Sequence, residues 1–244
     1  MRVKISFSKD NSASSSIPLH HQKLLSATLH ELASSFSLDP VPFNFSSLKG
    51  TSRIQNGFMK FLSTKVTMVL SSSDEAFLNK LIDEIFSRPY ITIGKMNLIA
   101  KGQDLIPDPA FQQRMRYLCI SPVVLVDPSV NSEKAQETIN PVSNLFSDAL
   151  YNSTLDRMEQ AGYSEAQLAS YAEFEIRPDR EYMEKINDSG KKFARFYKSN
   201  AGNTMMGYLL PFTLHAHTDV HRFIWQNGLG VLTNEGYGML DLVK

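Results

Sequence analysis

The stretch Gly-Leu-Gly-Val-Leu-Thr-Asn-Glu-Gly-Tyr-Gly, residues 228–238, organises the C-terminal end of the chain. Two Gly-x-Gly pairs bracket five residues, and the apolar run 239–243 follows at once. Glycine suits backbone that takes a positive φ or lies against a ligand with no side chain between. The regular spacing therefore predicts a loop that is shaped for close contact and leads into a last strand.

This loop has two interpretations, which concern its glycines Gly228, Gly230, Gly236 and Gly238. Successive backbone N–H groups in such a loop form a concavity that binds anions. The same spacing is equally typical of a tight connection in a packed α+β domain. A nucleotide-binding fingerprint is a poor match, because it needs a strand before the loop and a helix after it. A small-molecule enzyme that binds a nucleotide phosphate here is therefore disfavoured.

The composition restricts the class of protein. Lys+Arg and Asp+Glu both number 25 in 244 residues, so the formal net charge is zero. A protein of zero net charge is not expected to bind nucleic acid over its whole surface, but it can carry a local basic face that does. No apolar run approaches the roughly 18 residues of a membrane span, and the one cysteine, Cys119, fits a reducing compartment. We expect a cytoplasmic protein with no membrane partner.

The N-terminal part follows the order β-α-β-β-α-β. Apolar and polar residues alternate over 2–7, as in a half-buried strand. A helix is predicted over 22–36, where one apolar stripe is formed by Leu25, Leu29, Leu32 and Phe36. His30 lies off that stripe. Strands are expected at 43–46, 65–70 and 90–99, and the second helix should start at a capping box formed by Ser72 and Glu75.

After an expected linker at 101–109, the same order begins again. It comprises a strand at 117–126, a helix at 141–160, a strand pair at 191–197 and 206–214, a helix at 217–227 and the closing strand. A short strand at 172–176 is interpreted as an addition. The sequence thus predicts an α+β fold with two tandem ferredoxin-like domains, residues 1–102 and 110–244.

Four blocks occur in an order that resembles a known family. They are Pro18-Leu19-His20-His21-Gln22, Phe43-Asn44-Phe45-Ser46, Ser121-Pro122 and the glycine motif continuing into Met239-Leu240. Together with the tandem fold, they resemble the RAMP proteins of CRISPR systems. The resemblance is closer to the endoribonucleases that cut CRISPR repeat transcripts into guide RNAs.

This resemblance implies a reaction that uses no metal and no cofactor. The 2′-hydroxyl of one nucleotide attacks the adjacent phosphorus and leaves a 2′,3′-cyclic phosphate and a 5′-hydroxyl. Such chemistry needs a base, an acid and a group that stabilises the phosphorane charge. The implied partner is CRISPR repeat RNA, with a CRISPR effector complex as a further partner, and the protein would be a monomer or a homodimer.

The resemblance also implies a catalytic histidine in the first helix or the loop after it. His30 occupies the expected position late in the helix, whereas the segment from His30 to Phe43 contains no further histidine and no lysine. His30 is therefore the first catalytic candidate. His21 is the second, although a turn or capping role is favoured for it. Lys49 is the first cation that follows His30 in the sequence.

A basic stretch is the candidate RNA-binding strand. Phe193, Phe196 and Tyr197 interleave with the four bases Lys191, Lys192, Arg195 and Lys198. Cations that meet phosphates beside aromatics that stack on bases are typical of RNA binding. A strand with a solvated basic face over an aromatic core is the equal alternative.

Two further alternatives concern the activity. The chain could be a cleavage-inactive RNA-binding subunit of a larger ribonucleoprotein. A metal enzyme is disfavoured, because His215, His217 and His221 have no carboxylate or cysteine beside them at a familiar ligand spacing.

Overall fold

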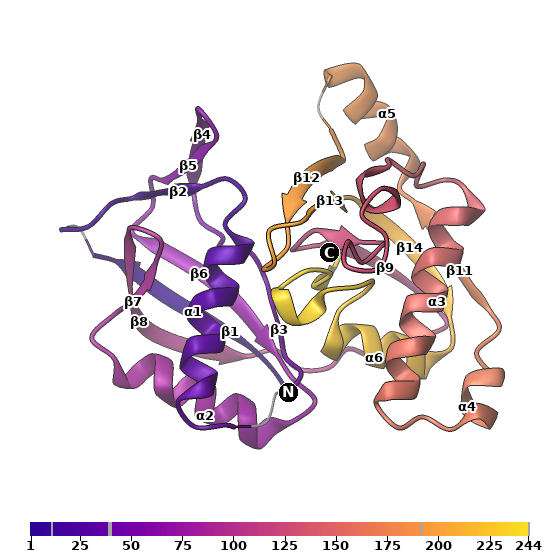
Figure 1. Cartoon of the computed structure of the whole chain (residues 1–244), viewed down its shortest axis with the longest axis horizontal. Helices are drawn as coiled ribbons and strands as arrows, with labels where there is room; N and C mark the ends of the chain where they lie inside the picture. Colours follow the sequence, from indigo (N-terminus) through magenta and orange to yellow (C-terminus); the bar gives the residue numbers. More distant parts are fainter. Residues whose placement is uncertain (11, 39–40, 191, 244) are drawn as a thin grey trace. The chain divides into compact units, whose positions relative to one another are not determined.

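Two separate antiparallel sheets, each of the ferredoxin-like strand order, form the frame of the protein. The computed structural model describes residues 1–10, 12–38, 41–190 and 192–243. The chain divides into two compact units (Figure 1): unit 1 is Met1–Pro107 with Asn234–Gly236, and unit 2 is Asp108–Thr233 with Tyr237–Lys244. The loop segment 234–236 therefore belongs with the N-terminal unit.

Unit 1 is built on a five-stranded sheet of order β3-β6-β1-β8-β7. Strands β6 and β8 both pair antiparallel with β1. The elements of unit 1 are β1 (Arg2–Lys9), β2 (Ser16–Pro18), α1 (Gln22–Ser34), β3 (Asn44–Phe45), β4 (Ser52–Gln55), β5 (Phe58–Phe61), β6 (Lys65–Ser71), α2 (Glu75–Ser87), β7 (Ile91–Ile93) and β8 (Met96–Leu105). Strands β2, β5 and β4 form a separate three-stranded sheet.

The core of unit 1 follows the periodicities in the sequence. Val3, Ile5 and Phe7 alternate along β1 and are buried. The predicted stripe of α1 is buried at Leu25, Leu29 and Leu32. Because successive strand residues point to opposite faces and helical residues three or four apart share one face, these side chains meet in one layer.

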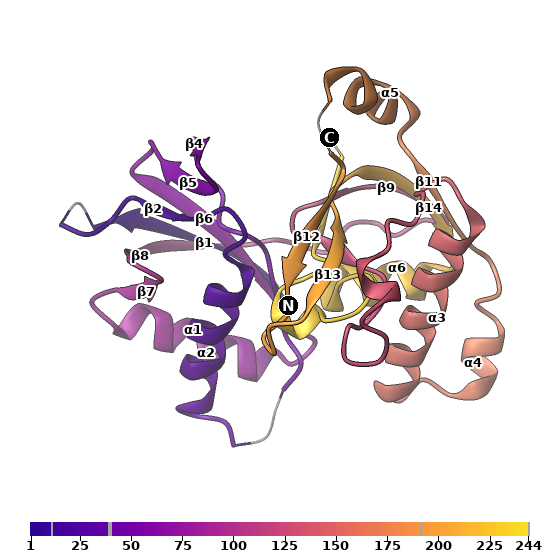
Figure 2. The same cartoon turned by 45° about the horizontal axis from the view of Figure 1, so that its top comes forward.

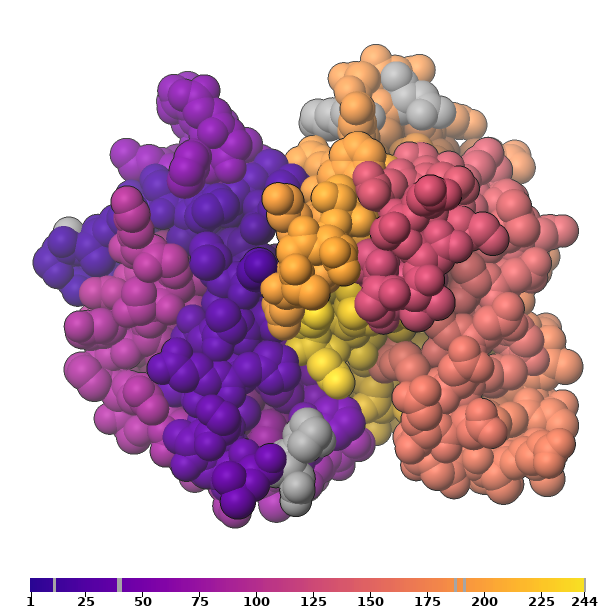
Figure 3. All heavy atoms as spheres, in the orientation of Figure 1, coloured from indigo at the N-terminus to yellow at the C-terminus, as the bar shows by residue number. Residues whose placement is uncertain are grey.

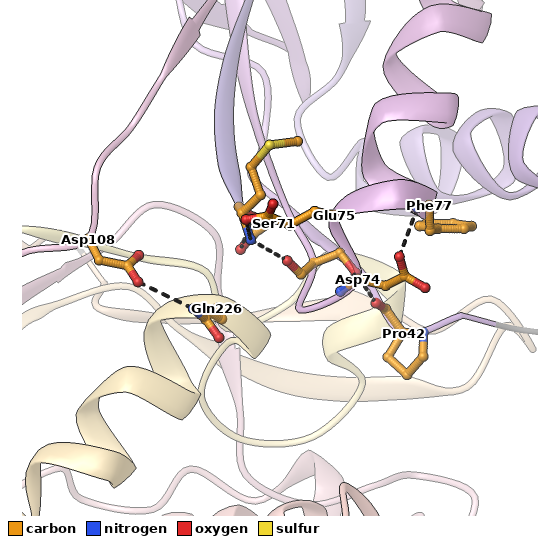
Figure 4. Close-up of polar contacts among 9 residues, drawn as sticks. Pro42, Ser71, Asp74, Glu75, Phe77, Asp108 and Gln226 are labelled. Atoms are coloured by element: carbon orange, nitrogen blue, oxygen red, sulfur yellow. Dashed lines mark hydrogen bonds and ion pairs between the residues drawn. The ribbon is translucent and has the colours of Figure 1, made fainter.

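The start of α2 differs from the prediction (Figure 4). Asp74 is the N-cap, and its carboxylate accepts from the Phe77 N–H at 2.9 Å. Ser72 accepts from the Asp74 N–H and donates to the Pro42 carbonyl at 2.8 Å, so it fixes the turn before the helix. The expected capping box of Ser72 and Glu75 is therefore wrong, because a better acceptor lies one residue before the helix.

Unit 2 is built on a four-stranded antiparallel sheet of order β11-β14-β9-β15. Its strands and helices are β9 (Arg114–Cys119), β10 (Val123–Val124), α3 (Asn144–Gln160), α4 (Glu165–Ala169), β11 (Phe174–Pro178), α5 (Arg180–Ser189), β12 (Ala194–Lys198), β13 (Thr204–Tyr208), β14 (Pro211–Ala216), α6 (Thr218–Asn227) and β15 (Leu240–Leu242). Short 3₁₀ helices lie at Lys134–Gln136 and Thr233–Glu235. The prediction of two ferredoxin-like domains is confirmed.

Two details of the predicted strand assignment are wrong. Strand β11, interpreted as an addition, is the edge strand of the ferredoxin-like sheet, where it pairs with β14. The addition is instead the separate sheet β10-β13-β12, which contains the basic strand. In unit 1, β8 continues through Leu105, so most of the predicted linker 101–109 is strand.

Candidate functional site

The four glycines of the glycine-rich loop are buried. All four of its glycines have a left-handed φ, between 75° and 84°. A Cβ atom at Gly236 would overlap the Phe45 ring, and one at Gly238 would overlap the Leu229 carbonyl. Glycine is therefore required here by backbone conformation and by space, as expected for a tight connection.

The main-chain polar groups of the loop bind to the protein itself. The N–H groups of Leu229 and Val231 donate to the carbonyls of Gly238 and Val124. The N–H groups of Gly228 and Gly238 also donate to main-chain carbonyls. These four donors are thus occupied and do not form an open anion-binding concavity. RNA contact by the glycines stays a prediction. Because they are buried, their role in the structure is to set the backbone conformation of the loop.

A cation that sequence reasoning missed fixes this loop. Arg157, on α3, donates to the carbonyls of Asn227, Gly228 and Gly230 at 2.6–3.0 Å. Its guanidinium also lies 5.3 Å from the centre of the Phe223 ring. Burial lowers the pKa of Arg157 to about 10, which still leaves it charged at neutral pH. The contacts are to carbonyls of a distant loop, so no local spacing could have revealed them.

His30 lies on the exposed side of α1, as the helical stripe predicts. Its Nε2 is 2.8 Å from the Asn234 carbonyl oxygen, an acceptor, so Nε2 carries the proton. The Phe43 ring lies 4.9 Å away between centroids. In the neutral ring, Nδ1 is then the nitrogen with the lone pair. Asn234 thereby sets which nitrogen can act as a base.

A surface hollow of about 310 Å³ adjoins His30. It is lined by His30, Ala33, Ser34, Ser37, Leu38, Val41, Phe43, Phe77 and Asn234. Of the lining residues that the structure describes, His30 is the one with a titratable side chain. The hollow thus offers apolar surface and a single proton-transfer group.

His21, the second catalytic candidate, is buried. Its Nδ1 lies 3.2 Å from the Leu19 carbonyl, and its Nε2 accepts from the Leu48 N–H at 3.1 Å. Burial lowers the pKa of His21 to about 4, so the ring is neutral at pH 7. Both nitrogens are occupied within the fold. This geometry gives His21 a structural role and makes it a poor acid or base for RNA.

Gln22, next to His21, was not identified from the sequence. Its buried side chain donates to the Gly236 carbonyl and accepts from the Ser47 hydroxyl. It thereby ties the start of α1 to the glycine-rich loop. Lys49 is exposed and lies on a main-chain bridge with Thr67, with N–H to carbonyl distances of 2.8 Å in both directions.

The basic strand is β12, at the edge of its small sheet. Lys192, Arg195 and Lys198 are exposed, and Phe196 is 54% exposed between them. Tyr197 is buried instead. Lys191 lies outside the described residues. Three cations and an exposed aromatic ring therefore share this edge of unit 2.

The remaining histidines do not converge on a metal. His221 is buried and bonds the Tyr117 hydroxyl at 2.9 Å and the Gln113 carbonyl at 3.2 Å. His217 caps α6 by accepting from the Asp219 N–H. Within the described ranges, no three side chains of His, Cys, Asp or Glu come together as a metal site.

The glycine-rich loop and the second unit coincide with a known family model. The model "CRISPR associated protein Cas6, C-terminal" matches residues 106–242, more than half of the chain. The chain belongs to the Cas6 family. The match over residues 106–242 confirms the resemblance to the CRISPR proteins that the sequence motifs indicate.

Similar proteins agree with this assignment. A CRISPR-associated endoribonuclease-like protein of Pyrococcus horikoshii, Cas6nc, is 22% identical over 187 residues, which cover 76% of this chain and 72% of the relative. A solved Cas6-related protein of Pyrococcus furiosus has a TM-score of 0.80 at 18% identity and covers 100% of this chain and 98% of its own. A RAMP protein described as binding different RNA substrates has a TM-score of 0.79 at 18% identity, with 100% of both chains covered.

In the part of the chain that the structure describes, no helix has both the length and the apolarity that a membrane span needs.

Proposed function

We propose that this Cas6 family member is an endoribonuclease that cuts CRISPR repeat RNA by attack of a 2′-hydroxyl on the adjacent phosphorus. The observation that carries the proposal is the tautomer of His30, that is, which ring nitrogen carries the proton. The Asn234 carbonyl holds the proton on Nε2, so Nδ1 keeps the lone pair, and the exposed His30 side chain lines a hollow. Nδ1 can accept the 2′-hydroxyl proton, which makes His30 the general base.

The other candidate residues have roles in binding and charge. Lys192, Arg195 and Lys198 contact phosphates, and Phe196 stacks on a base. Lys49 stabilises the negative charge of the phosphorane. The glycines act by shaping the loop that presents the Asn234 carbonyl to His30. No metal or cofactor takes part, and the protein works in the cytoplasm as a monomer or homodimer, alone or with a CRISPR effector complex.

A second function is favoured by one specific observation. Among the described residues, the lining of the hollow contains no titratable partner for His30, and His21 is buried with both nitrogens occupied. A reaction that needs both an acid and a base is poorly served by one group. The alternative is therefore a cleavage-inactive subunit that binds repeat RNA within a CRISPR ribonucleoprotein.

One experiment distinguishes these two functions. Repeat RNA is incubated with excess protein in EDTA, as a normal strand and with one 2′-deoxy nucleotide just 5′ of the cut. The endoribonuclease cuts the normal strand to a 2′,3′-cyclic phosphate and leaves the deoxy strand intact, because the nucleophile is missing. Binding of both strands without any cut identifies the subunit. Cleavage of the deoxy strand, or cleavage only after magnesium is added, would refute the 2′-hydroxyl mechanism.

A further inference from the structure

The small sheet β2-β5-β4 of unit 1 is not used by the proposed reaction. Its hairpin β4–β5 turns at Asn56 and Gly57, which have φ values of 51° and 75°. Positive φ at both turn residues is typical of a tight hairpin connection that follows the twist of its strands. In Figures 1 and 2 the hairpin projects away from the five-stranded sheet, and in Figure 3 it stands out from the surface.

The register places four polar or aromatic side chains on one face of the hairpin. Arg53 lies opposite Lys60, and Gln55 lies opposite Phe58. Because side chains alternate along a strand, these four share a face. All four are exposed, and Phe58 keeps 52% of its surface accessible. The alternate position Phe61 is buried in the core, which fixes the orientation of the hairpin.

Two cations directly opposite each other destabilise a sheet. In the described part of the chain, neither Arg53 nor Lys60 forms an ion pair or a side-chain hydrogen bond. One carboxylate, that of Asp10, lines a hollow beside Lys60. Its oxygens accept from the Ser12 N–H at 3.0 Å and the Ser12 hydroxyl at 2.8 Å. Bonded to Ser12, the Asp10 carboxylate stays anionic, but it forms no salt bridge with Lys60, so among the described residues no acid is paired directly with Arg53 or Lys60.

We propose that this face binds an unpaired segment of RNA. Arg53 and Lys60 would contact successive phosphates, and one base would stack on the Phe58 ring. The Gln55 amide, on the same face, would form hydrogen bonds with the edge of that base. This inference rests on the proposed function, that the protein binds RNA. Cations beside an exposed aromatic ring are the usual elements of single-strand binding, and a duplex would not offer a free base to Phe58.

A second copy of the chain suits this face poorly. In a two-fold contact the same patch occurs on both partners. Arg53 and Lys60 would then meet Arg53 and Lys60, so that four cations would face one another. A polyanion removes the repulsion within the hairpin instead of increasing it. Charge complementarity therefore favours RNA over self-association.

The first test removes the two charges. Fluorescence anisotropy measures the affinity of the Arg53→Gln/Lys60→Gln variant for repeat RNA and for a 20-nucleotide oligouridine across a salt series. We expect the salt slope of log K to decrease by about 1.4, since each single-strand phosphate contact contributes about 0.7. The charge-matched control is Lys80→Gln/Arg88→Gln, at an exposed position of α2 and at the exposed residue that follows it, and this variant should keep the parent slope.

The second test separates function from stability. Arg53→Glu places opposite charges across the hairpin, so its Tm should rise by about 1–2 °C while RNA binding weakens. A stabilising role for Arg53 would give a lower Tm instead. Phe58→Leu keeps an apolar side chain without the ring, and it should weaken binding about fivefold or more. In the parent, an RNA with 5-iodouridine should crosslink to the peptide that contains Phe58.

The outcomes distinguish this inference from the proposed function. If the parent binds repeat RNA and the Arg53→Gln/Lys60→Gln variant has the same affinity and salt slope, the inference is overturned and the proposed function stands. If the parent binds neither RNA, both fail. A variant whose sedimenting mass changes while its RNA affinity does not would show a protein interface, which also overturns the inference.

Discussion

The glycine-rich loop and the surface around His30 are fixed in opposite ways. In the loop, buried glycines have left-handed φ values, and Arg157 donates to the carbonyls of Asn227, Gly228 and Gly230. On the α1 surface, His30 is exposed and its contacts are the Asn234 carbonyl and the Phe43 ring. The glycine motif, which is recognisable in the sequence, thus serves the packing of the fold. The catalytic candidate His30 is exposed and makes few contacts. Loop substitutions should therefore act on stability first, and His30 substitutions on rate first.

The largest effect is expected at His30. His30→Ala should reduce single-turnover cleavage by roughly two to four orders of magnitude, the usual contribution of a positioned proton-transfer group. Its unfolding free energy should change by less than about 0.5 kcal/mol, because the ring is exposed. RNA affinity should change little, and Lys49→Ala should reduce the rate less than His30→Ala does.

The matched control for His30 is His20→Ala, because His20 is also exposed and lies just before α1. It should keep the parent rate. Full activity in His30→Ala would show that the enzyme works without this histidine. It would also contradict the expectation that His30 substitutions act on rate and loop substitutions on stability.

The next largest effect concerns the stability of the loop. Gly238→Ala should cost roughly 3–5 kcal/mol of unfolding free energy, since it combines left-handed strain with overlap of the Leu229 carbonyl. Gly57→Ala is the control, because Gly57 has the same φ of 75° but no atom within 4 Å of an added Cβ. It should cost only about 1–2 kcal/mol. Equal costs in urea denaturation would show that packing does not require Gly238.

A third effect links His21 to pH. Its pKa is about 4 in the fold against an ordinary value of 6.5, because burial favours the neutral ring. Its stabilisation is complete above pH 6.5 and is lost as the pH falls toward 4, since the unfolded chain then binds a proton that the folded chain does not. The loss should reach about 3 kcal/mol in the parent.

Urea midpoints between about pH 4 and pH 7.5 measure this loss. The His21→Asn variant should lack it, whereas the other titrating groups are common to both proteins and cancel in the difference. Identical pH profiles in parent and variant would contradict a buried, neutral His21.

The smallest effect is expected on the basic strand of unit 2. Arg195→Gln should reduce the salt slope of RNA binding by about 0.7 and weaken affinity a few-fold, while cleavage at saturating RNA stays unchanged. Lys134→Gln, an exposed cation of the same unit in a short 3₁₀ helix, is the control. An unchanged slope in Arg195→Gln would favour the alternative of a merely solvated basic face.

The sequence by itself determined the fold class and the main helices of both units. The stripe of Leu25, Leu29 and Leu32 predicted both α1 and the exposed position of His30, because helical periodicity is a local property. The glycine spacing predicted a loop with demanding backbone geometry. Together with the order of elements, this was enough for the α+β fold and for the two ferredoxin-like units, and the three other sequence blocks added the resemblance to the family.

The tertiary structure alone decided which strands pair and which side chains are buried. Strand β11 belongs to the ferredoxin-like sheet and β12 does not, although their local patterns gave the opposite assignment. Pairing depends on partners far along the chain, so propensity alone does not select it. The burial of His21 and the bonds of Arg157 to the loop have the same origin. Each is a contact between segments whose separation in sequence carries no information about their distance in the fold.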